Sequence, residues 1–325
     1  KTKKMLKNTP AMYKREYPFL KEVDSLALAN VQLHLEKAYK NFFRDPKIGF
    51  PKFKSKHHSR NSYTTNVVNG NILVESKRIR LPKLKWIAMK KHREPAKGLR
   101  LKSVTVSMEP SGKYFASLLY EGDSCENQAA EPDYSTAKIL GIDYAMQGMA
   151  VFSEEIEMEE AGFFRKNEKR LVREQRKLSR CVRGSHNYEL QKKKVARCHE
   201  KIRNQRRDHL HKLSRKIADG YDAAAVEDID MKAMGQCLHF GKSVHDNGYG
   251  MFREMLDYKL AWKGKKIVKV DRFFPSSKKC CQCGRIKKEL KLSERVYHCV
   301  CGNEMDRDRN AAINIREEAR RMLIA

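Results

Sequence analysis

The amino-acid sequence predicts a multidomain α+β protein, and three observations support this prediction. The chain has 325 residues, of which 40% are hydrophobic, enough for two or three domains with buried cores. Short apolar runs between residues 71 and 120 follow one another without an intervening helix, as in an antiparallel β domain. Two further apolar runs, at 137–143 and 223–229, flank a long helical stretch, as in an α/β domain.

The charge of the chain indicates the class of its partner. Lys and Arg number 69 against 40 Asp and Glu, which gives a formal net charge of +29. Such an excess on a folded chain favours a polyanion, with nucleic acid the first candidate and an anionic membrane surface the second. No apolar run approaches the roughly 20 residues of a membrane span, so we expect no membrane partner.

The first segment, residues 1–48, is predicted to be helical. Apolar residues recur at helical spacing from Pro18 to Phe43. Prolines and a glycine between residues 45 and 51 end this pattern. A helix that only packs against a core would account for its apolar face.

Aromatic rings alternate with basic residues in the next stretch, FPKFKSKHHSRNSYTT. Rings stack on bases while Lys and Arg contact phosphates, so this pattern is typical of a nucleic-acid surface. A solvated charge run with its rings turned into a core would give the same pattern. The candidate contact residues are Lys52, Phe53, Lys54, Lys56 and Tyr63.

Residues 49–133 are predicted to form a small antiparallel β-barrel. Its expected strands are residues 72–75, 78–81, 86–89, 103–108 and 113–120. The sequence Glu109-Pro110-Ser111-Gly112 is a good hairpin turn before the last of them.

Two later strands contain carboxylates at the end of an apolar run. The first, at 137–143, ends in Asp143, with 149–152 as its expected hairpin partner, and the second, at 223–229, contains Glu227 beside Asp228. A carboxylate is costly to bury unless it is paired or binds metal. A turn aspartate just past a strand end is the alternative for Asp143.

Residues 163–217 are predicted to form a strongly basic helical hairpin. Gly184 and Ser185 interrupt two apolar stripes. Arg203, Arg206 and Arg207 have few acidic residues to balance them, so phosphate contact is favoured over a merely solvated helix face.

Two cysteine pairs predict a zinc ribbon at residues 276–303. Cys280 and Cys283 precede one glycine, and Cys299 and Cys301 precede another. Without a secretion signal, nine cysteines indicate a reducing compartment, where paired cysteines more often bind Zn²⁺ than form disulfides. The alternative is a set of buried thiols without metal. The second pair is one residue shorter than the common spacing, and Cys281 is an adjacent spare cysteine.

A third acidic centre, Asp306 and Asp308, opens the last helix. Together with Asp143 and Glu227 it fits a nuclease site in which carboxylates hold two Mg²⁺ ions. Either aspartate alone could instead be a helix N-cap.

The chain resembles the TnpB family of transposon-encoded RNA-guided nucleases, which are related to compact type V CRISPR effectors. The residues that carry the resemblance are Tyr17-Pro18-Phe19-Leu20, Phe50-Pro51-Lys52-Phe53-Lys54, Gly141-Ile142-Asp143, Val226-Glu227-Asp228, Ser276-Ser277-Lys278 and Asp306-Arg307-Asp308-Arg309-Asn310-Ala311-Ala312. The resemblance implies that Asp143, Glu227 and Asp308 are the catalytic Mg²⁺ ligands, with Asp306 a neighbour.

The resemblance also implies a domain plan. The expected segments are a recognition-lobe remnant (1–48), an oligonucleotide-binding-like wedge barrel (49–133), a RuvC-like nuclease domain of RNase H fold (134–275), the zinc-ribbon insertion (276–303) and a C-terminal RuvC helix (304–325). Members of the family normally have a first barrel strand and further recognition helices ahead of the region matched by Lys1, so we expect a truncated or processed chain. The short second knuckle is expected to alter the loop beside Asp308.

The implied function is RNA-guided cleavage of double-stranded DNA beside a short target-adjacent motif, with a guide RNA transcribed from the transposon end, two Mg²⁺ ions and a structural Zn²⁺. Such a protein is expected in the prokaryotic cytoplasm, associated with the nucleoid. A nuclease-inactive RNA-guided repressor of the same family is the alternative, but it would be expected to lose one or more of the three acids. A transposase that joins DNA itself would need a strand-transfer nucleophile that no motif here specifies.

Overall fold

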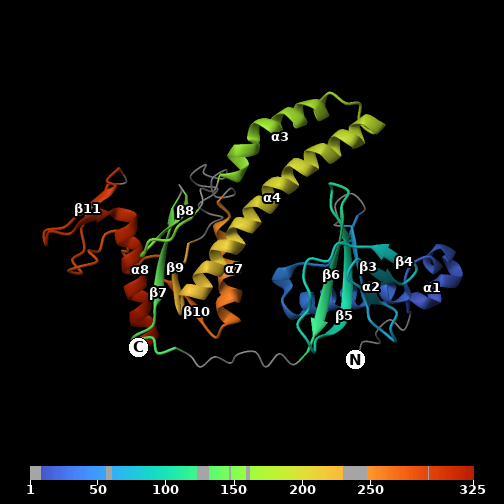
Figure 1. Cartoon of the computed structure of the whole chain (residues 1–325), viewed down its shortest axis with the longest axis horizontal. Coiled ribbons are helices and arrows are strands. Elements are labelled where there is room, and N and C mark those ends of the chain that lie inside the picture. The colour runs from blue at the N-terminus through green and yellow to red at the C-terminus, as the bar shows by residue number, and fades with distance from the viewer. Residues whose placement is uncertain are drawn as a thin grey trace. The chain divides into compact units, whose positions relative to one another are not determined.

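The computed structural model describes residues 9–55, 61–122, 132–145, 148–158, 162–229, 247–291 and 293–325. They belong to two compact units, Lys1–Ser124 and Cys125–Ala325, whose elements are labelled in Figure 1. No helix in the described ranges is both long enough and apolar enough to span a membrane. The two units are treated separately below.

The first unit contains two three-stranded antiparallel sheets. One has the order β1 (Ser62–Asn66), β5 (Arg100–Met108), β6 (Tyr114–Glu121), and the other β2 (Leu73–Val74), β3 (Arg78–Leu81), β4 (Lys85–Ala88). Residues from both sheets and their connections share one small core made of Ile72, Ile79, Leu81 and Val104.

The expected closed barrel is therefore not what the described residues form. A barrel has no free edges because its first and last strands pair, whereas β6 and β4 are each the last strand of a separate sheet. The strands of the second sheet are only two to four residues long, so each offers few backbone groups for pairing with a further strand. The predicted strands themselves are present, and β1 is an additional strand that the apolar pattern did not predict.

Helix α2 (Ser25–Arg44) is fixed to this additional strand. It is preceded by α1 (Pro10–Glu16) and a 3₁₀ turn (Pro18–Lys21). The Asp24 carboxylate caps α2 by accepting a hydrogen bond from the Leu26 N–H (3.2 Å), and it also accepts one from the Thr65 hydroxyl of β1. The helix therefore begins at Ser25, seven residues after the predicted start, because Asp24 caps it there. The same side chain ties the start of the helix to the sheet.

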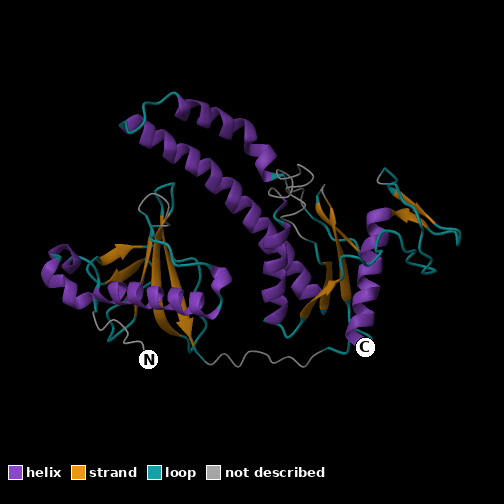
Figure 2. Ribbon diagram, turned by 180° about the vertical axis from the view of Figure 1, so that it is seen from behind, coloured by secondary structure: helices purple, strands orange, loops and turns teal. Residues whose placement is uncertain are grey.

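The second unit is built on a four-stranded mixed sheet. Its order is β10 (Lys266–Val270), β9 (Ala223–Glu227), β7 (Ile139–Ala145), β8 (Met149–Phe152), with β10, β9 and β7 parallel and β8 antiparallel to β7. Helices α4 (His186–Gly220) and α7 (Tyr249–Ala261) cover one face, and α8 (Arg307–Ile324) covers the other (Figures 1 and 2). Both faces are apolar because the central strands read almost continuously as Ala, Val, Ile and Leu.

The predicted basic hairpin is confirmed by α3 (Phe163–Ser179) and α4. Leu171, Cys198 and Ile202 form its small core. Ser185 caps α4 by accepting a hydrogen bond from the Tyr188 N–H at 3.1 Å. Figure 1 shows α3 and the first half of α4 extending beyond the sheet.

Candidate active site and cysteine cluster

The pairing of two central strands brings Asp143 and Glu227 together. Strands β7 and β9 run parallel, and their register ends at the pair Ile142–Val226. The next residue on each strand is Asp143 and Glu227, so these two acids are neighbours at the carboxyl ends of adjacent parallel strands. Asp143 lies inside β7, which continues to Ala145, and it is not a turn residue past the strand end.

Burial makes this pair of acids chemically unusual. Burial, together with the charges of Glu227 and Asp308, raises the pKa of Asp143 to about 8, and burial raises the pKa of Glu227. Among the described residues no basic side chain forms an ion pair with either acid. Both carboxylates are half-buried, and the charge of Arg307 offsets only part of the rise in the Asp143 pKa. A proton or a bound cation would stabilise the pair.

The third acid, Asp308, approaches from another element. It lies in the first turn of α8, and its charge is one of the causes of the raised Asp143 pKa. Its carboxylate is three-quarters buried and contacts the guanidinium groups of Arg307 (3.3 Å) and Arg295 (3.7 Å). Helix α8 therefore adds a carboxylate to the two that the sheet supplies.

Asp306 has a different role from Asp308. Its side chain caps α8 by accepting hydrogen bonds from the N–H groups of Asp308 (3.0 Å) and Arg309 (2.9 Å). The N-cap alternative considered for both aspartates thus applies to Asp306. Asp228, beside Glu227, is also engaged elsewhere, because it faces Arg253 and Arg272 at 3.8 Å.

A glycine in β7 lets α8 come close enough to contribute its acid. A Cβ added to Gly141 would lie 1.9 Å from the carbonyl oxygen of Ala312 and 2.9 Å from the Cβ of Arg316. Only a residue without a side chain permits this contact between strand and helix. Because Gly141 is two residues before Asp143, the contact lies next to the acidic site.

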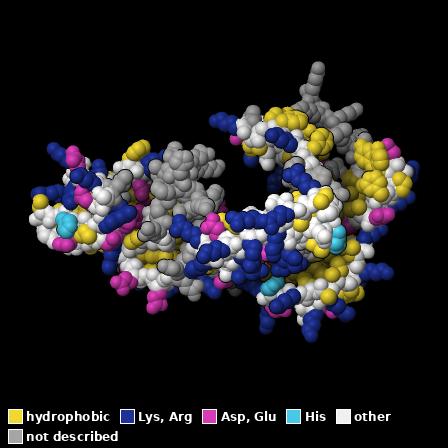
Figure 3. All heavy atoms as spheres, turned by 90° about the horizontal axis from the view of Figure 1, so that it is seen from above, with side chains coloured by type: hydrophobic (Ala, Val, Ile, Leu, Met, Phe, Trp, Pro, Cys, Tyr) yellow, Lys and Arg dark blue, Asp and Glu magenta, His cyan; other side chains and the backbone are white. Residues whose placement is uncertain are grey.

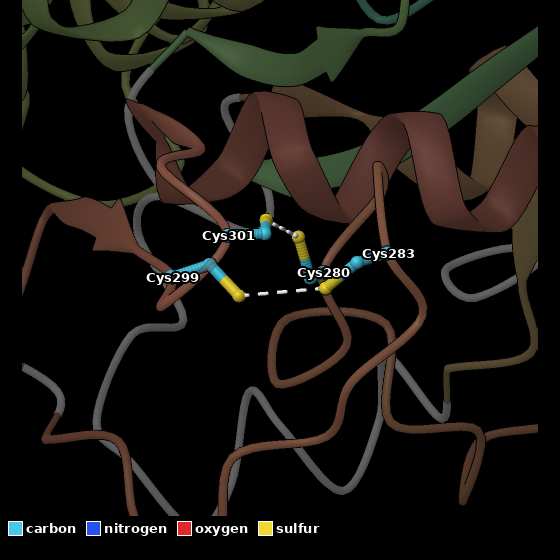
Figure 4. Close-up of side chains that lie close together, drawn as sticks. All are labelled: Cys280, Cys283, Cys299 and Cys301. Carbon is cyan, nitrogen blue, oxygen red and sulfur yellow. Dashed lines mark hydrogen bonds between the residues drawn. The ribbon is translucent and has the colours of Figure 1, made fainter.

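The four predicted zinc ligands lie together in the structure (Figure 4). The Sγ atoms of Cys280 and Cys301 are 3.7 Å apart, those of Cys283 and Cys299 are 3.6 Å apart, and all four lie within 4.8 Å of one another. Four thiolates bound tetrahedrally to Zn²⁺ at about 2.3 Å would lie about 3.8 Å from each other. The donor set and its spacing fit zinc.

Each cysteine pair is followed by a glycine that closes a hydrogen-bonded turn, and the second turn is one residue shorter than the first. The N–H groups of Gly284 and Gly302 donate to the carbonyls of Cys280 and Cys299, each at 3.0 Å. Both glycines have positive φ angles, 74° and 90°, a conformation that favours glycine. The shorter second pair thus ends in the same left-handed glycine conformation as the first.

The thiols of this cluster cannot all ionise without a cation. Burial of Cys280 opposes ionisation, but the backbone N–H groups of Cys283 and Gln282 lower its pKa to about 6. The pKa of Cys301 is raised to about 12: the Asn303 backbone favours its thiolate, but this is outweighed by burial and by Cys283, Cys299 and Cys280. A divalent cation would remove this repulsion.

The two candidate metal sites differ in compactness. The ligand atoms of the four cysteines all lie within 4.8 Å of one another. No other group of three or more His, Cys, Asp or Glu residues among the described ones is as compact. The carboxylates of Asp143, Glu227 and Asp308 are spread more widely. Thiolates suit Zn²⁺, whereas carboxylate oxygens suit Mg²⁺.

The predicted nucleic-acid residues of the first unit separate into two groups. Lys52, Phe53 and Lys54 are exposed, and Phe53 is fully so. Phe50, in contrast, packs edge-on against Tyr39 and Phe42 of α2, with ring centroids 5.6 and 5.5 Å apart. Phe50 is nevertheless exposed over most of its surface, so the two rings differ in having ring neighbours and not in being buried. Tyr63 is half-buried in β1, and Lys56 lies outside the described residues.

The predicted arginines of the second unit lie on α4. Arg203 and Arg207 are exposed, while Arg206 is half-buried beside Gly248 at the start of α7. Lys and Arg side chains gather on the surface of the α3–α4 hairpin in the view from above (Figure 3). Six more basic residues line a hollow on α3: Arg165, Lys169, Arg173, Arg176, Lys177 and Arg180.

One residue near the acids was missed by the sequence reasoning. Tyr249, at the start of α7, is buried, and after burial itself the charges of Asp143 and Glu227 are among the causes that raise its pKa. Its ring packs edge-on against Tyr144 at 4.8 Å. A signal was present in the sequence, because Tyr249, Phe252 and Leu256 recur at helical spacing.

Two family descriptions match the second unit and the chain just before it. Residues 118–237, which include Asp143 and Glu227, match a family described as "Probable transposase". Residues 249–315, which include the four clustered cysteines and Asp308, match the "Cas12f1-like, TNB domain".

Similar proteins extend over most of the chain. A "Putative RNA-guided DNA endonuclease" of Streptomyces pristinaespiralis is 34% identical over 305 residues, covering 92% of this chain and 73% of that protein. The "Putative RNA-guided DNA endonuclease InsQ" of Escherichia coli (strain K12) is 32% identical over 316 residues, covering 92% and 76%.

A solved structure shares the fold. One chain of the "Cryo-EM structure of the Cas12f1-sgRNA-target DNA complex" matches with a TM-score of 0.54 and 15% identity, covering 90% of this chain and 71% of that one. At this level of identity the match concerns the fold alone.

Proposed function

This chain belongs to the TnpB family of RNA-guided DNA endonucleases, and on that basis we propose that it cleaves DNA at a site formed by Asp143, Glu227 and Asp308. The observation that supports the site most strongly is the register of β7 and β9, which makes Asp143 and Glu227 neighbours. The influence of the Asp308 charge on Asp143 supports its inclusion.

Two Mg²⁺ ions held by these acids would activate a water molecule and stabilise the leaving 3′ oxygen of the phosphodiester. Asp143 holds a proton near neutral pH when no cation is bound, because its pKa is about 8. Cation binding must therefore release this proton from its carboxyl group. Glu227 from the sheet and Asp308 from α8 would contribute the remaining negative charge.

Basic side chains support the binding of RNA and DNA backbones. In this proposal the α3–α4 hairpin, with Arg203, Arg206 and Arg207, contacts phosphates, while the exposed Lys52, Phe53 and Lys54 contact nucleic acid from the first unit. A guide RNA from the transposon end selects the double-stranded target by base pairing, and the protein holds the heteroduplex through its backbone. The segments 1–48 and 49–133 act as recognition and wedge segments, and the rest as a RuvC-like nuclease with its ribbon.

Zinc has a structural role in this proposal. Cys280, Cys283, Cys299 and Cys301 would fill all four positions of a tetrahedral ion, which leaves none for substrate. The site is thus typical of structural zinc and not of catalytic zinc.

The function can be tested with the purified complex of protein and its co-expressed RNA. We expect cleavage of a plasmid that carries the matching target, only when Mg²⁺ is present, and loss of cleavage in Asp143→Ala with binding retained. If the unaltered complex binds the target in Mg²⁺ without cutting it, the nuclease proposal is wrong and the guided-repressor alternative applies.

A further inference from the structure

Two buried asparagines lie on one face of the helix that carries Asp308. Asn310 is fully buried and Asn314 is 3% exposed. They are four residues apart and therefore neighbours on the same side of α8. Buried amides need hydrogen-bond partners, and both find them in the segment that contains the first zinc ligand.

The bonds of Asn310 enclose Cys280. Its Oδ1 accepts a hydrogen bond from the Cys281 N–H at 3.0 Å, and its Nδ2 donates to the Lys279 carbonyl at 2.7 Å. The peptide groups on both sides of Cys280 are thus attached to one side chain of α8. The helix passes beside the four cysteines in Figure 4.

Asn314 reinforces this attachment one turn later. Its Nδ2 donates to the carbonyls of Ser276 (2.8 Å) and Lys279 (2.6 Å). The Lys279 carbonyl therefore accepts from both asparagines, and the loop from Ser276 to Cys281 follows the helix surface closely.

The ribbon also meets the start of α8. Its two strands, β11 (Val296–His298) and β12 (Glu304–Asp306), pair Val296 with the capping residue Asp306. The Arg307 N–H donates to the Arg295 carbonyl at 2.8 Å, and the Arg295 guanidinium lies 3.7 Å from the Asp308 carboxylate. The ribbon thus touches α8 both at its first turn and along the asparagine face.

The opposite constraint on α8 comes from the sheet. Gly141 lies directly against the Ala312 carbonyl, between the two asparagines in sequence. The apolar face of α8, with Ile315 and Ala319, also packs on the sheet. A helix held by the sheet on one side and by the ribbon on the other cannot rotate or slide without breaking contacts to one of them. Rotation about its axis would move Asp308 relative to Asp143 and Glu227.

From these contacts we infer that Asn310 and Asn314 are positioning residues: they transmit the order of the zinc-bound ribbon to α8 and so fix Asp308 in the acidic site. This inference rests on the proposed function for the role of Asp308. Zinc then acts on cleavage at a distance, by holding Cys280 and the loop around it. Without the asparagines, the ribbon can bind zinc, but its loop from Ser276 to Cys281 no longer holds α8 in place.

The test uses the full chain with its RNA and compares Asn310→Ala with Asn314→Ala. A displacement of a catalytic group by about 1 Å costs roughly 100-fold in rate, so we expect roughly that loss of single-turnover cleavage in Asn310→Ala. Asn314→Ala should lose less, because Lys279 keeps its bond to Asn310. Zinc content and target affinity should remain those of the unaltered protein, while half-saturation by Mg²⁺ shifts to higher concentration.

Hydrogen exchange gives a readout independent of activity. In Asn310→Ala the amides at the start of α8 should exchange faster, with zinc still bound. The control is Glu254→Gln, which changes an exposed side chain of α7 and should change none of these quantities.

A double variant tests the linkage itself. If Asn310 transmits the effect of zinc, then Cys299→Ser and Asn310→Ala should each slow cleavage, and their combination should slow it by little more than the larger single effect. Fully multiplicative effects, or normal cleavage and Mg²⁺ dependence in both asparagine variants, would overturn the inference. Normal cleavage in Asp308→Ala would instead overturn the proposed site, whatever the asparagine variants do.

Discussion

Gly141 of β7 lies so close to α8 that a Cβ in its place would approach the Ala312 carbonyl oxygen to 1.9 Å. The obstacle is backbone, which cannot move aside like the end of a flexible side chain. This contact sets the distance between the helix that carries Asp308 and the strand that carries Asp143.

Gly141→Ala should therefore both destabilise the protein and abolish cleavage. Overpacking of a core costs about 1–3 kcal/mol, and more where backbone must move, so we expect a loss of about 3 kcal/mol in the free energy of unfolding. Chemical denaturation and a cleavage assay measure the two effects. Gly220→Ala is the matched control: a Cβ there meets nothing within 4 Å, and stability and cleavage should be unchanged.

The buried Asp143 predicts an unusual dependence of stability on pH. Its ordinary pKa of 3.8 applies to the unfolded chain, whereas in the folded chain burial, with Glu227 and Asp308, raises it to about 8. The folded state therefore binds more protons between these values, and the free energy of unfolding falls as pH rises through them. Each pKa unit corresponds to about 1.4 kcal/mol, so the penalty at pH 8 amounts to a few kcal/mol.

Asp143→Asn removes this penalty. Without divalent metal, its melting temperature should exceed that of the unaltered protein at about pH 8, and the difference should vanish near about pH 4. Mg²⁺ should stabilise the unaltered protein and not the variant. Asp228→Asn changes an acid that faces Arg253 and Arg272 instead, so its melting curve should keep the pH trend of the unaltered protein. An equal pH trend in Asp143→Asn would contradict the prediction.

The extent to which sequence predicted this structure depends on how each feature is encoded. Asp143 and Glu227 could be predicted because each interrupts an apolar strand, and the four clustered cysteines because their spacing fits one metal. Strand β1 could not be predicted from an apolar pattern. It is held partly by a hydrogen bond between the hydroxyls of Thr64 and Thr105 (2.8 Å), and such polar pairing leaves no hydrophobic alternation to detect.

The contacts between α8 and the loop from Ser276 to Cys281 could not be predicted from the sequence either. Asn310 belongs to the motif from Asp306 to Ala312 and Asn314 follows it, but the partners of both lie 29 to 38 residues earlier in the loop from Ser276 to Cys281. No periodicity connects an amide with a backbone carbonyl in an irregular segment, so only the folded chain shows what these side chains do. The barrel prediction was wrong for a related reason. Apolar patterns indicate individual strands, but they do not show whether the edge strands of two sheets pair with each other.

Zinc removal is predicted to loosen the ribbon before the rest of the second unit. Cys283→Ser should abolish stoichiometric zinc, because three thiolates remain where a structural site needs four ligands. Elemental analysis measures the metal, and limited proteolysis between Cys283 and Cys299 measures the loosening. Cys181→Ser, which changes a cysteine far from the cluster in sequence and outside it, should retain zinc. Full zinc content in Cys283→Ser would exclude the four-cysteine site.

The motif after α2 predicts opposite effects for its two rings. Phe53 is fully exposed, so Phe53→Ala should leave the melting temperature unchanged and weaken RNA binding, by about 1–3 kcal/mol if a base stacks on it. Phe50 is 61% exposed but contacts the rings of Tyr39 and Phe42, so Phe50→Ala should lower the melting temperature of the first unit slightly. Fluorescence anisotropy with the bound RNA, together with thermal unfolding, separates the two outcomes.

The lysines beside these rings predict a change in salt dependence. If Lys52 and Lys54 contact phosphates, each Lys→Ala variant should reduce the slope of log K against log salt by about 1, since one fewer counterion is released per lost contact. Lys263 is the matched control because its ammonium is already paired with Asp219 at 2.7 Å, and Lys263→Ala should leave the slope unchanged. If all three variants keep the slope of the unaltered protein, Lys52 and Lys54 do not contact phosphates and are ordinary solvated charges.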